Sequence, residues 1–230
     1  MAPAWQDAPT VERRGETFYL LPARAVFWPT RRALLVADLH WGKDATFRAH
    51  RIPLPEGPLA ADLATLSALL EATRAEHIYV LGDLVHARPS GRSEVVEAVA
   101  AWREQWDAVE MTLVEGNHDR HLRQLPESWQ IPRIAPPLCL GEIALVHEPT
   151  DVPGHFTWAG HLHPMWKLRE RKTMLRLPCF AVGQTLGILP AFHPFTGGPV
   201  PKVGDEGEIF VVAEDAVVPL QANKEAPKSP

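Results

Sequence analysis

The sequence predicts an α/β fold that contains two β-sheets. Short apolar runs typical of buried strands alternate with runs at helical spacing through the first half of the chain. Several of the strand-like runs end abruptly in Asp, Asn or His. In the second half, short strand-like runs follow one another without helical periods between them, which indicates a second sheet packed on the first.

The N-terminal part of the chain is expected to form the first strands. Residues 17–21 and 25–28 are typical of a β-hairpin that turns between them. The hairpin leads into the apolar run Ala33 to Ala37, which is followed by Asp38 and His40. Because residues i and i+2 of an extended chain lie on the same side, this carboxylate and this imidazole can converge on one point. Asp38 and His40 could therefore bind the same metal ion.

Two segments with helical spacing are expected to separate the next strands. The first follows Pro58, a residue suited to the first turn of a helix, and we expect this helix to cover one face of the sheet. A shorter helix is expected at 44–50, before a Pro-rich loop at 52–58. The apolar stripes are Leu59, Leu63, Leu66 and Leu70 in the first long helix and Val95, Val99, Trp102 and Trp106 in the second.

The remaining strand-like runs fall into two groups. Two of them, 77–81 and 109–114, alternate with the helices. The others lie in the second half, at 143–146, 156–159, 174–177, 180–182, 185–189 and 208–213. Because ligands of open α/β sheets lie beyond the carboxyl ends of the strands, the polar residues that follow these runs are expected to line one site.

The polar residues at the strand ends form a set of oxygen and imidazole donors. The set contains no cysteine, and such donors suit Mn, Fe, Zn or a similar divalent ion rather than a soft copper site. It is larger than one ion needs, and a carboxylate such as Asp83 can bridge two ions. The candidates are Asp38, His40, Asp83, Asn117, His118, His147, His161 and His163.

Composition argues against several classes of protein. The 230 residues include 23 Lys and Arg and 28 Asp and Glu, and the net charge of −5 gives no global positive field that would attract a polyanion. Cys139 and Cys179 form no CxxC pair, and we interpret them as buried free thiols in a reducing cytosol. No run approaches the ~20 apolar residues of a membrane span, and MAPAWQDAPT at the N-terminus has no signal-peptide pattern. A soluble cytoplasmic protein without membrane association is expected.

Five short motifs occur in the order typical of one family. They are DLH at 38–40, GD at 82–83, GNHD at 116–119, VH at 146–147 and GHLH at 160–163. In this order, at strand ends, they resemble the calcineurin-like metallophosphoesterase superfamily. The segment FWPTRRALLVADLHWGK and the turn IPLPEG extend the resemblance to the bacterial metallophosphoesterases associated with a DNA ligase and a helicase, a subfamily of DNA damage response endonucleases.

The resemblance implies a fold as well as a chemistry. The implied fold is a four-layer α/β/β/α sandwich of two mixed sheets flanked by helices, with the site above the strand ends. The chain length suits one domain, which we expect over residues 1–221. The polar, Pro-rich segment 222–230 is expected to be a disordered tail.

The resemblance also implies a role for each motif residue. Two divalent metal ions are implied, with Mn expected and Fe or Zn as alternatives. Asp38, His40 and His163 would hold one ion, and Asn117, His147 and His161 the other, with Asp83 as the bridge. A hydroxide on the metals would be the nucleophile. His118 would protonate the leaving oxygen as a general acid, and Asp119 would hold His118 in orientation.

One motif departs from the family pattern. The family's GDxxD is GDLVH here, which puts His86 in place of a supporting Asp. His86 is either a substrate contact or a hydrogen-bonded structural residue. Lys43 and Arg48, which follow the first motif, either approach a phosphate group or belong to a solvated face.

A run of basic residues follows the last motif. Lys167, Arg169, Arg171 and Lys172, with Trp166 beside them, combine cations with an aromatic side chain, as nucleic-acid contacts do. A β-hairpin with a polar exposed face explains this run equally well.

Three functions remain open at this point. The first is a two-metal phosphodiesterase that hydrolyses DNA, a nuclease of DNA repair with a DNA ligase and a helicase as candidate partners. The second is the same chemistry on a small phosphodiester or a nucleotide, which the acidic net charge supports mildly. The third is a non-catalytic protein-binding scaffold, but such a protein tends to lose metal ligands or the acid, and here all of them are present.

Overall fold

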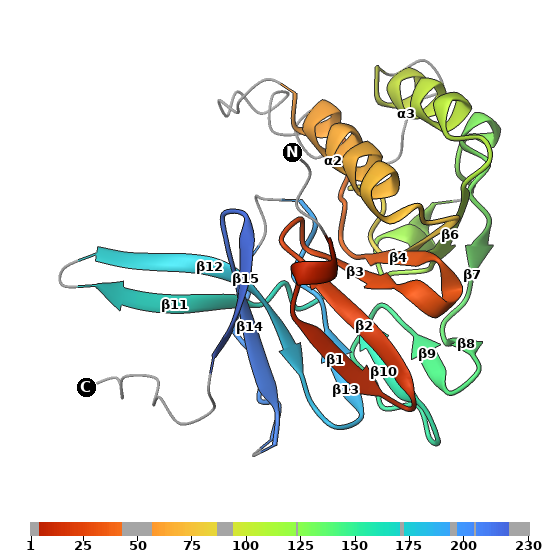
Figure 1. Ribbon diagram of the computed structural model, residues 1–230. Coiled ribbons are helices and arrows are strands. Elements are labelled where there is room, and N and C mark those ends of the chain that lie inside the picture. Colours follow the sequence, from red (N-terminus) through yellow and green to blue (C-terminus); the bar gives the residue numbers. More distant parts are fainter. Residues whose placement is uncertain are drawn as a thin grey trace.

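The computed structural model describes residues 5–42, 57–86, 94–122, 124–170, 173–193, 197–204 and 206–220, without the side chains of residues 169, 170 and 173. Two sheets pack face to face, and two helices cover the outer face of the first sheet (Figure 1). The helix expected at 44–50 and the tail at 222–230 lie outside the described residues, and so do Lys43 and Arg48.

The first sheet has seven strands in the order β1-β2-β3-β4-β5-β6-β7. Neighbours are antiparallel from β1 to β4 and parallel from β4 to β7. Parallel pairing requires crossover connections, and helices α2 and α3 provide two of them. The strands are β1 (Thr10–Arg13), β2 (Glu16–Leu21), β3 (Ala25–Trp28), β4 (Ala33–Val36), β5 (His77–Leu81), β6 (Glu110–Val114) and β7 (Arg133–Ile134).

The second sheet has eight strands, and seven of them follow the order β15-β14-β12-β13-β10-β9-β8. Strands β9, β10 and β13 run parallel to one another, and the other pairs are antiparallel. The eighth strand, β11 (Met165–Glu170), pairs with β12. The others are β8 (Leu138–Leu140), β9 (Ile143–Leu145), β10 (Phe156–Ala159), β12 (Thr173–Val182), β13 (Leu186–Ile188), β14 (Glu208–Ala213) and β15 (Ala216–Leu220).

The two long helices lie where the apolar stripes predict them, although the second ends one residue before Trp106, the last residue of its stripe. Helix α2 (Pro58–Thr73) has Pro58 in its first turn and ends where the N–H of Arg74 donates to the carbonyl of Leu70. Helix α3 (Glu94–Gln105) buries Val99 and Trp102 on its inner side. Short 3₁₀ helices lie at η1 (Trp5–Asp7), η2 (Pro29–Arg31), η3 (Asp119–His121) and η4 (Glu127–Trp129).

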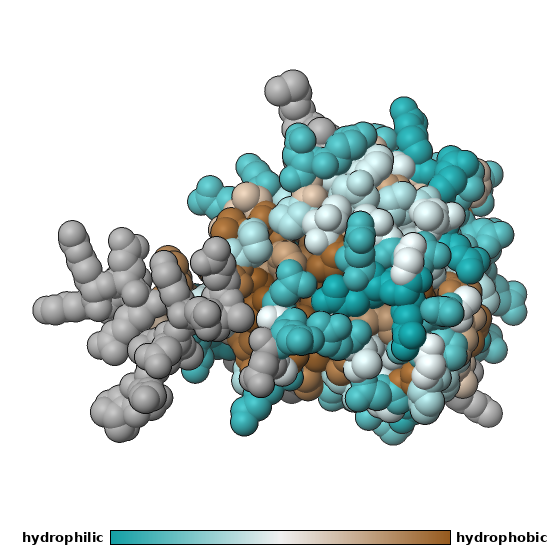
Figure 2. Space-filling model, turned by 60° about the horizontal axis from the view of Figure 1, so that its bottom comes forward, coloured by the Kyte–Doolittle hydropathy of each residue, from teal (hydrophilic) through white to brown (hydrophobic). Residues whose placement is uncertain are grey.

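Three apolar clusters hold these layers together. The cluster between the sheets is rich in aromatic rings, and the ring of Phe18 lies 5.3 Å from that of Trp158 on the opposite sheet. A second cluster fills the space between the first sheet and the two helices. The third covers the outer face of the second sheet, where Val152, Leu162 and Val203 pack from loops on buried strand residues. The face seen in Figure 2 carries mostly hydrophilic side chains, with hydrophobic areas between them.

The predicted α/β sandwich of two mixed sheets is confirmed. In the part of the chain that the structure describes, however, both long helices pack on the first sheet, and loops cover the second. The reason lies in the connections. Strands β11, β12 and β13 follow one another through short connections, as do β14 and β15, which leaves no room there for a crossover helix. The longer connection from β13 to β14 contains no helix in its described parts, residues 189–193, 197–204 and 206–207.

Most predicted strands occupy their expected positions, and 25–28, 77–81, 156–159 and 208–213 agree to the residue. The runs 174–177 and 180–182 form the single strand β12, because Pro178 pairs with β11 and the strand then continues into the sheet. The sequence analysis missed β1, β7, β8 and β15, which are short or carry many polar residues. It gave a β-hairpin as one of two interpretations of the basic run that starts at Lys167, and β11 and β12 form such a hairpin.

The two cysteines differ in exposure. Cys179 is buried in β12, and burial raises the pKa of its thiol to about 12. Cys139 is exposed on β8, so the expectation of a buried thiol is wrong at this position. It is wrong because β8 is the last strand of its sheet in the observed order. None of the described helices has the length and hydropathy required to span a bilayer.

Candidate metal centre

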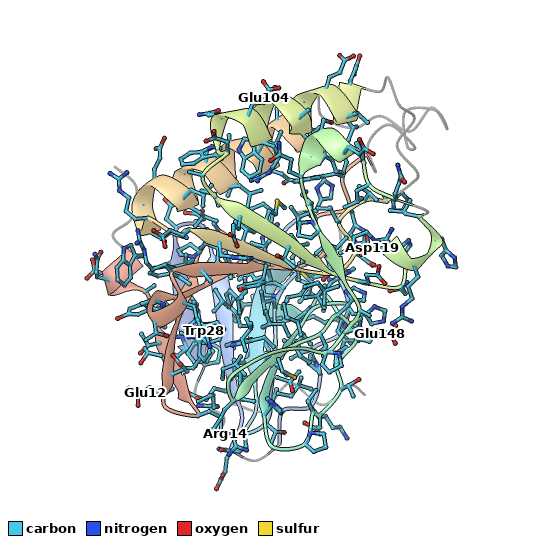
Figure 3. All side chains as sticks on the ribbon, turned by 90° about the vertical axis from the view of Figure 1, so that its right-hand side faces the viewer. Glu12, Arg14, Trp28, Glu104, Asp119 and Glu148 are labelled. Atoms are coloured by element: carbon cyan, nitrogen blue, oxygen red, sulfur yellow. The ribbon has the colours of Figure 1, made fainter. Side chains whose placement is uncertain are left out.

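The candidate ligands gather where the parallel strands of both sheets end. Asp38 and His40 follow β4, Asp83 follows β5 and Asn117 follows β6 in the first sheet. From the second sheet, His147 follows β9, and His161 and His163 follow β10. Figure 3 labels Asp119 and Glu148 beside this edge of the sandwich, whereas Glu12 and Arg14 lie at the other end.

The first group consists of Asp38, His40 and His163. One potential ligand atom from each residue lies within 4.8 Å of those of the other two. Nε2 of His163 is 3.0 Å from Oδ1 of Asp38, and neither atom has a hydrogen-bond partner among the described residues. Asp38 is fully buried and His40 is 4% exposed. A buried carboxylate oxygen and an imidazole nitrogen therefore face each other where one cation could bind both, and such a cation would offset the buried charge of Asp38.

The second group consists of Asp83, His147 and His161, whose ligand atoms also lie within 4.8 Å of one another. Nε2 of His147 is 3.4 Å from Oδ1 of Asp83 and 3.0 Å from Nδ1 of His161. Oδ1 of Asn117 lies 2.9 Å from the same Nε2 atom. The structure thus brings together all seven residues that the sequence analysis named as metal ligands, in the two sets expected there.

The tautomer of His147 follows from its other ring nitrogen. Nδ1 lies 2.9 Å from the carbonyl oxygen of Leu81, and because a carbonyl can only accept, Nδ1 carries the proton. Nε2 then presents a lone pair to the second group. A backbone or carboxylate partner that fixes the tautomer in this way is usual for metal-binding histidines.

The backbone at the candidate ligands is left-handed at five positions. Only a few per cent of residues other than glycine adopt a positive φ, and Asp, Asn and His are enriched among them. Such a residue costs about 1–3 kcal/mol and persists where the surrounding structure imposes it. The φ angles are 57° at Asp38, 49° at His40, 50° at Asp83, 71° at His161 and 47° at His163.

This backbone corrects one step of the sequence analysis. Asp38 and His40 do converge, but they do so beyond the end of β4 at Val36, in left-handed turns rather than along an extended strand. The spacing of two residues was the right signal for convergence, and the reason given for it was wrong.

Two glycines in the motifs are required by close approaches to the candidate ligands. A Cβ atom on Gly82 would lie 2.2 Å from Nδ1 of His147, and one on Gly116 would lie 2.4 Å from Oδ1 of Asp83. Real Cβ atoms do not approach so closely. The GD and GN dipeptides therefore allow neighbouring loops to pack against the site without a side chain between them.

His118 lies at the exposed edge of the two groups. Its side chain is 43% exposed, and its Nε2 is 3.9 Å from Oδ2 of Asp83. Its backbone N–H donates to Oδ1 of Asp83 at 3.1 Å. The ring centre lies 5.7 Å from that of His40. A group in this position can reach both solvent and a molecule bound at the site.

The sequence analysis expected Asp119 to hold the ring of His118 in orientation, but the carboxylate of Asp119 binds backbone groups instead. Its carboxylate is fully buried and accepts hydrogen bonds from the backbone N–H groups of Asp83 (2.7 Å), Leu84 (3.2 Å) and Gly116 (2.9 Å). These bonds tie the loop after β5 to the loop after β6. Burial raises the pKa of Asp119, the charge of Asp83 adds to this, and the backbone hydrogen bonds oppose it.

Arg133 is a supporting residue that the sequence analysis missed. From β7, its guanidinium donates to the carbonyls of Asp119 (2.9 Å) and Leu122 (2.8 Å) and to the carboxylate of Glu115 (3.0 Å). It thereby braces the segment that carries His118. No motif marks this position, because the segments meet only through the pairing of β6 with β7.

His86 belongs to the same cluster of rings. Its centre lies 6.0 Å from that of His40 and 5.9 Å from that of His118. The other two residues suggested as substrate contacts, Lys43 and Arg48, lie outside the described residues. The position of His86 is compatible with a contact to a molecule bound over the two groups.

The donors present fit two divalent ions. Each group combines a carboxylate oxygen with two imidazole nitrogens, a set that suits Mn, Fe or Zn. The unpartnered Oδ1 of Asp38 and Nε2 of His163 have the positions of ligands rather than of structural hydrogen-bonding groups.

Comparison with known proteins identifies similar chains. Residues 31–177 match the family model for calcineurin-like phosphoesterases. The Pseudomonas putida nuclease MPE is 36% identical over 93% of this chain and 100% of that chain, with a TM-score of 0.77. The Aquifex aeolicus protein AQ665, of unknown function, is 19% identical over 61% of this chain and 81% of that chain, with a TM-score of 0.41. The Escherichia coli phosphoesterase YfcE is 16% identical over 83% and 99%, with a TM-score of 0.38. A search of curated proteins gave no match.

Replacement of Gly82 by Ala tests the close approach to His147. The added Cβ would displace the His147 ring, so we expect Gly82→Ala to lower the amount of Mn bound per chain after reconstitution and dialysis. Gly154→Ala is the matched control, because Gly154 has a similar φ of 80° and no atom within 4 Å of its would-be Cβ. Equal metal content in the two variants would contradict the proposed position of His147.

Proposed function

The chain belongs to the calcineurin-like phosphoesterase family and is a hydrolase of phosphoester bonds, and from this we propose that it is a dinuclear, metal-dependent phosphodiesterase that cleaves DNA. The observation that carries the DNA part is the 36% identity to a nuclease over nearly the whole of both chains. The two groups of candidate ligands support the dinuclear part.

Seven residues would hold the two metal ions. Asp38, His40 and His163 would bind one ion, and Asn117, His147 and His161 the other, with Asp83 between them. We propose Mn, with Fe or Zn as alternatives that accept the same donors. When bound, two such ions would activate water and offset the charge at phosphorus.

His118 is proposed as the general acid. Breaking a phosphodiester bond releases an alkoxide, which needs a proton, and His is the side chain that most readily supplies one near neutral pH. The backbone bond from His118 to Asp83 fixes the start of this side chain beside the ligands. The Asp119 carboxylate and the Arg133 guanidinium hold the backbone on either side of His118 in place.

The cellular role is part of the same proposal. The resemblance of FWPTRRALLVADLHWGK and IPLPEG to ligase-associated phosphoesterases supports a nuclease of DNA repair in the cytoplasm, acting beside a DNA ligase and a helicase. A small phosphodiester or a nucleotide is the second candidate substrate, supported by the net charge of −5, which disfavours long polyanions in general.

One experiment separates the two substrates. Mn-reconstituted protein is incubated with matched single-stranded, duplex and flapped DNA and, in parallel, with bis-p-nitrophenyl phosphate. Cleavage of both DNA and the model diester supports a nuclease. Hydrolysis of the model diester alone moves the substrate to a small molecule, and hydrolysis of neither would favour a protein-binding scaffold.

Asp83 is the residue expected to serve both ions. Replacement of Asp83 by Ala should lower the metal content at both sites, since a bridging carboxylate contributes to each. Metal per chain can be measured by elemental analysis after dialysis. Glu104→Ala, an exposed acidic position on α3 remote from Asp119 (Figure 3), is the control. Two ions retained per chain in the Asp83 variant would contradict the bridge.

Loss of the general acid should affect turnover and spare the metals. For His118→Ala we expect kcat on DNA to fall by about 10²–10⁴, the usual range for such a group, with metal content near normal. His121→Ala is the matched control, because His121 is exposed and is the last residue of the 3₁₀ helix η3, which directly follows His118. Unchanged turnover in the His118 variant would remove the assignment.

Replacement of His86 tests whether this residue contacts the substrate or has a structural role. We propose the former, since its ring lies within 6.0 Å of those of His40 and His118. His86→Ala should then raise KM for DNA while metal content and melting temperature stay near those of the parent protein. A fall in metal content or stability with KM unchanged would instead assign it a structural role.

A further inference from the structure

The hairpin of β11 and β12 extends away from both sheets (Figure 1). Residues 173–178 of β12 pair with β11, and β12 joins β14 only from Cys179 onward. An isolated two-stranded hairpin has marginal stability in water. Packing within the two sheets does not account for this hairpin, so we expect it to have a role outside the sandwich.

The strand register gives the hairpin two different faces. Cross-strand partners lie on the same face of an antiparallel pair. Trp166 is opposite Leu177 and Leu168 is opposite Leu175, which makes one face apolar. On the other side Lys167 is opposite Arg176, between the pairs Met165–Pro178 and Arg169–Met174, and we call this side the basic face. The side chains of Lys167 and Arg176 are both exposed.

The pairing of Lys167 with Arg176 is unfavourable for the hairpin itself. Like charges directly opposite each other destabilise an antiparallel pair. No ion pair to either residue occurs among the described side chains. Two adjacent cations that form no ion pair with a described side chain, in a chain with a net charge of −5, form a local surface that is complementary to an anion.

The basic face begins close to the backbone of one candidate ligand, His163. Met165, the first residue of β11, lies two positions after the candidate ligand His163. The N–H of Gly198 donates to the carbonyl of His163 at 2.7 Å, and the N–H of Met165 donates to the carbonyl of Gly198 at 3.2 Å. A Cβ on Gly197 would lie 3.4 Å from Nη2 of Arg176. The guanidinium of Arg176 therefore lies over the segment that fixes the backbone of His163.

We propose that the basic face, through Lys167 and Arg176, binds phosphate groups of the DNA strand on one side of the bond that is cleaved. The inference rests on the proposed function, which it deepens by adding a binding surface outside the metal centre. Phosphate contacts of this kind position a strand without reading its sequence. A projecting strand pair with a charged side can follow the backbone of a single strand over several nucleotides, as basic grooves do in other single-strand binders.

The test is charge reversal on the hairpin. In Lys167→Glu/Arg176→Glu, we expect Kd for a labelled single-stranded oligonucleotide of about 20 nucleotides to rise at least tenfold. The slope of log Kd against log salt should fall by roughly 0.7 for each phosphate group that the variant no longer neutralises. The kcat/KM for this oligonucleotide, divided by that for bis-p-nitrophenyl phosphate, should fall by a similar factor.

The matched control reverses two other exposed arginines, Arg14 at the β1–β2 turn and Arg74 after α2, and so changes the net charge equally. Equal Kd values and salt slopes for the two double variants would overturn the proposal. The same holds if Leu168→Asp/Leu175→Asp on the apolar face weakens DNA binding and the charge reversal does not. Failure of the proposed function is distinguishable, because the unsubstituted protein would then hydrolyse the model diester and leave DNA intact.

Discussion

The candidate centre depends on hydrogen bonds that cross from one sheet to the other. His147 of the second sheet donates through Nδ1 to the carbonyl of Leu81 in the first, and the N–H of His161 donates to Oδ2 of Asp38. Site residues themselves make these bonds, so a shift of one sheet against the other would separate the ligands. The aromatic cluster between the two sheets holds them in a fixed relative position and therefore also fixes the distances between the candidate ligands. A closely packed interior of this kind resists small shifts.

The site combines several unfavourable features that the rest of the fold offsets. Five candidate ligands have left-handed backbones, and the carboxylates of Asp38, Asp83 and Asp119 are buried. Asp38 and Asp83 both lie within 3.8 Å of the His147 ring, and the charge of Asp83 acts on Asp119. Hydrogen bonds with backbone groups offset part of this cost. Three amides converge on Asp119, and Arg133 holds the following turn. Strain of this kind is common at functional sites, where surrounding structure imposes a conformation that the local sequence disfavours.

The sequence predicted those elements whose structure depends on a local pattern of apolar residues. Buried strands are apolar runs and amphipathic helices repeat every three to four residues, so β5, β10 and α2 could be predicted closely. The ligands could be named because they directly follow such strands. The orientation of the Asp119 carboxylate and the bracing by Arg133 could not be predicted, since both depend on how three loops meet in space. For the strand β11 the sequence left a hairpin and a nucleic-acid contact open, because Lys, Arg and Glu alternate with apolar residues outside the core.

A buried acid elsewhere in the chain shows how this protein stabilises a carboxylate by its own side chains. Asp62 on α2 lies 3.1 Å from Nδ1 of His193, and its charge also acts on Arg24, where burial is the larger influence and lowers the pKa. Asp38 is just as buried, yet its Oδ1 faces Nε2 of His163 without a hydrogen bond among the described residues. A buried charge needs a compensating charge, which an imidazolium or a bound cation can supply. Each acid has one imidazole nitrogen at a similar distance, 3.0 Å for Asp38 and 3.1 Å for Asp62. Asp38 alone of the two belongs to a group of three potential ligands among the described residues, and this favours a metal at Asp38 and a structural role for Asp62.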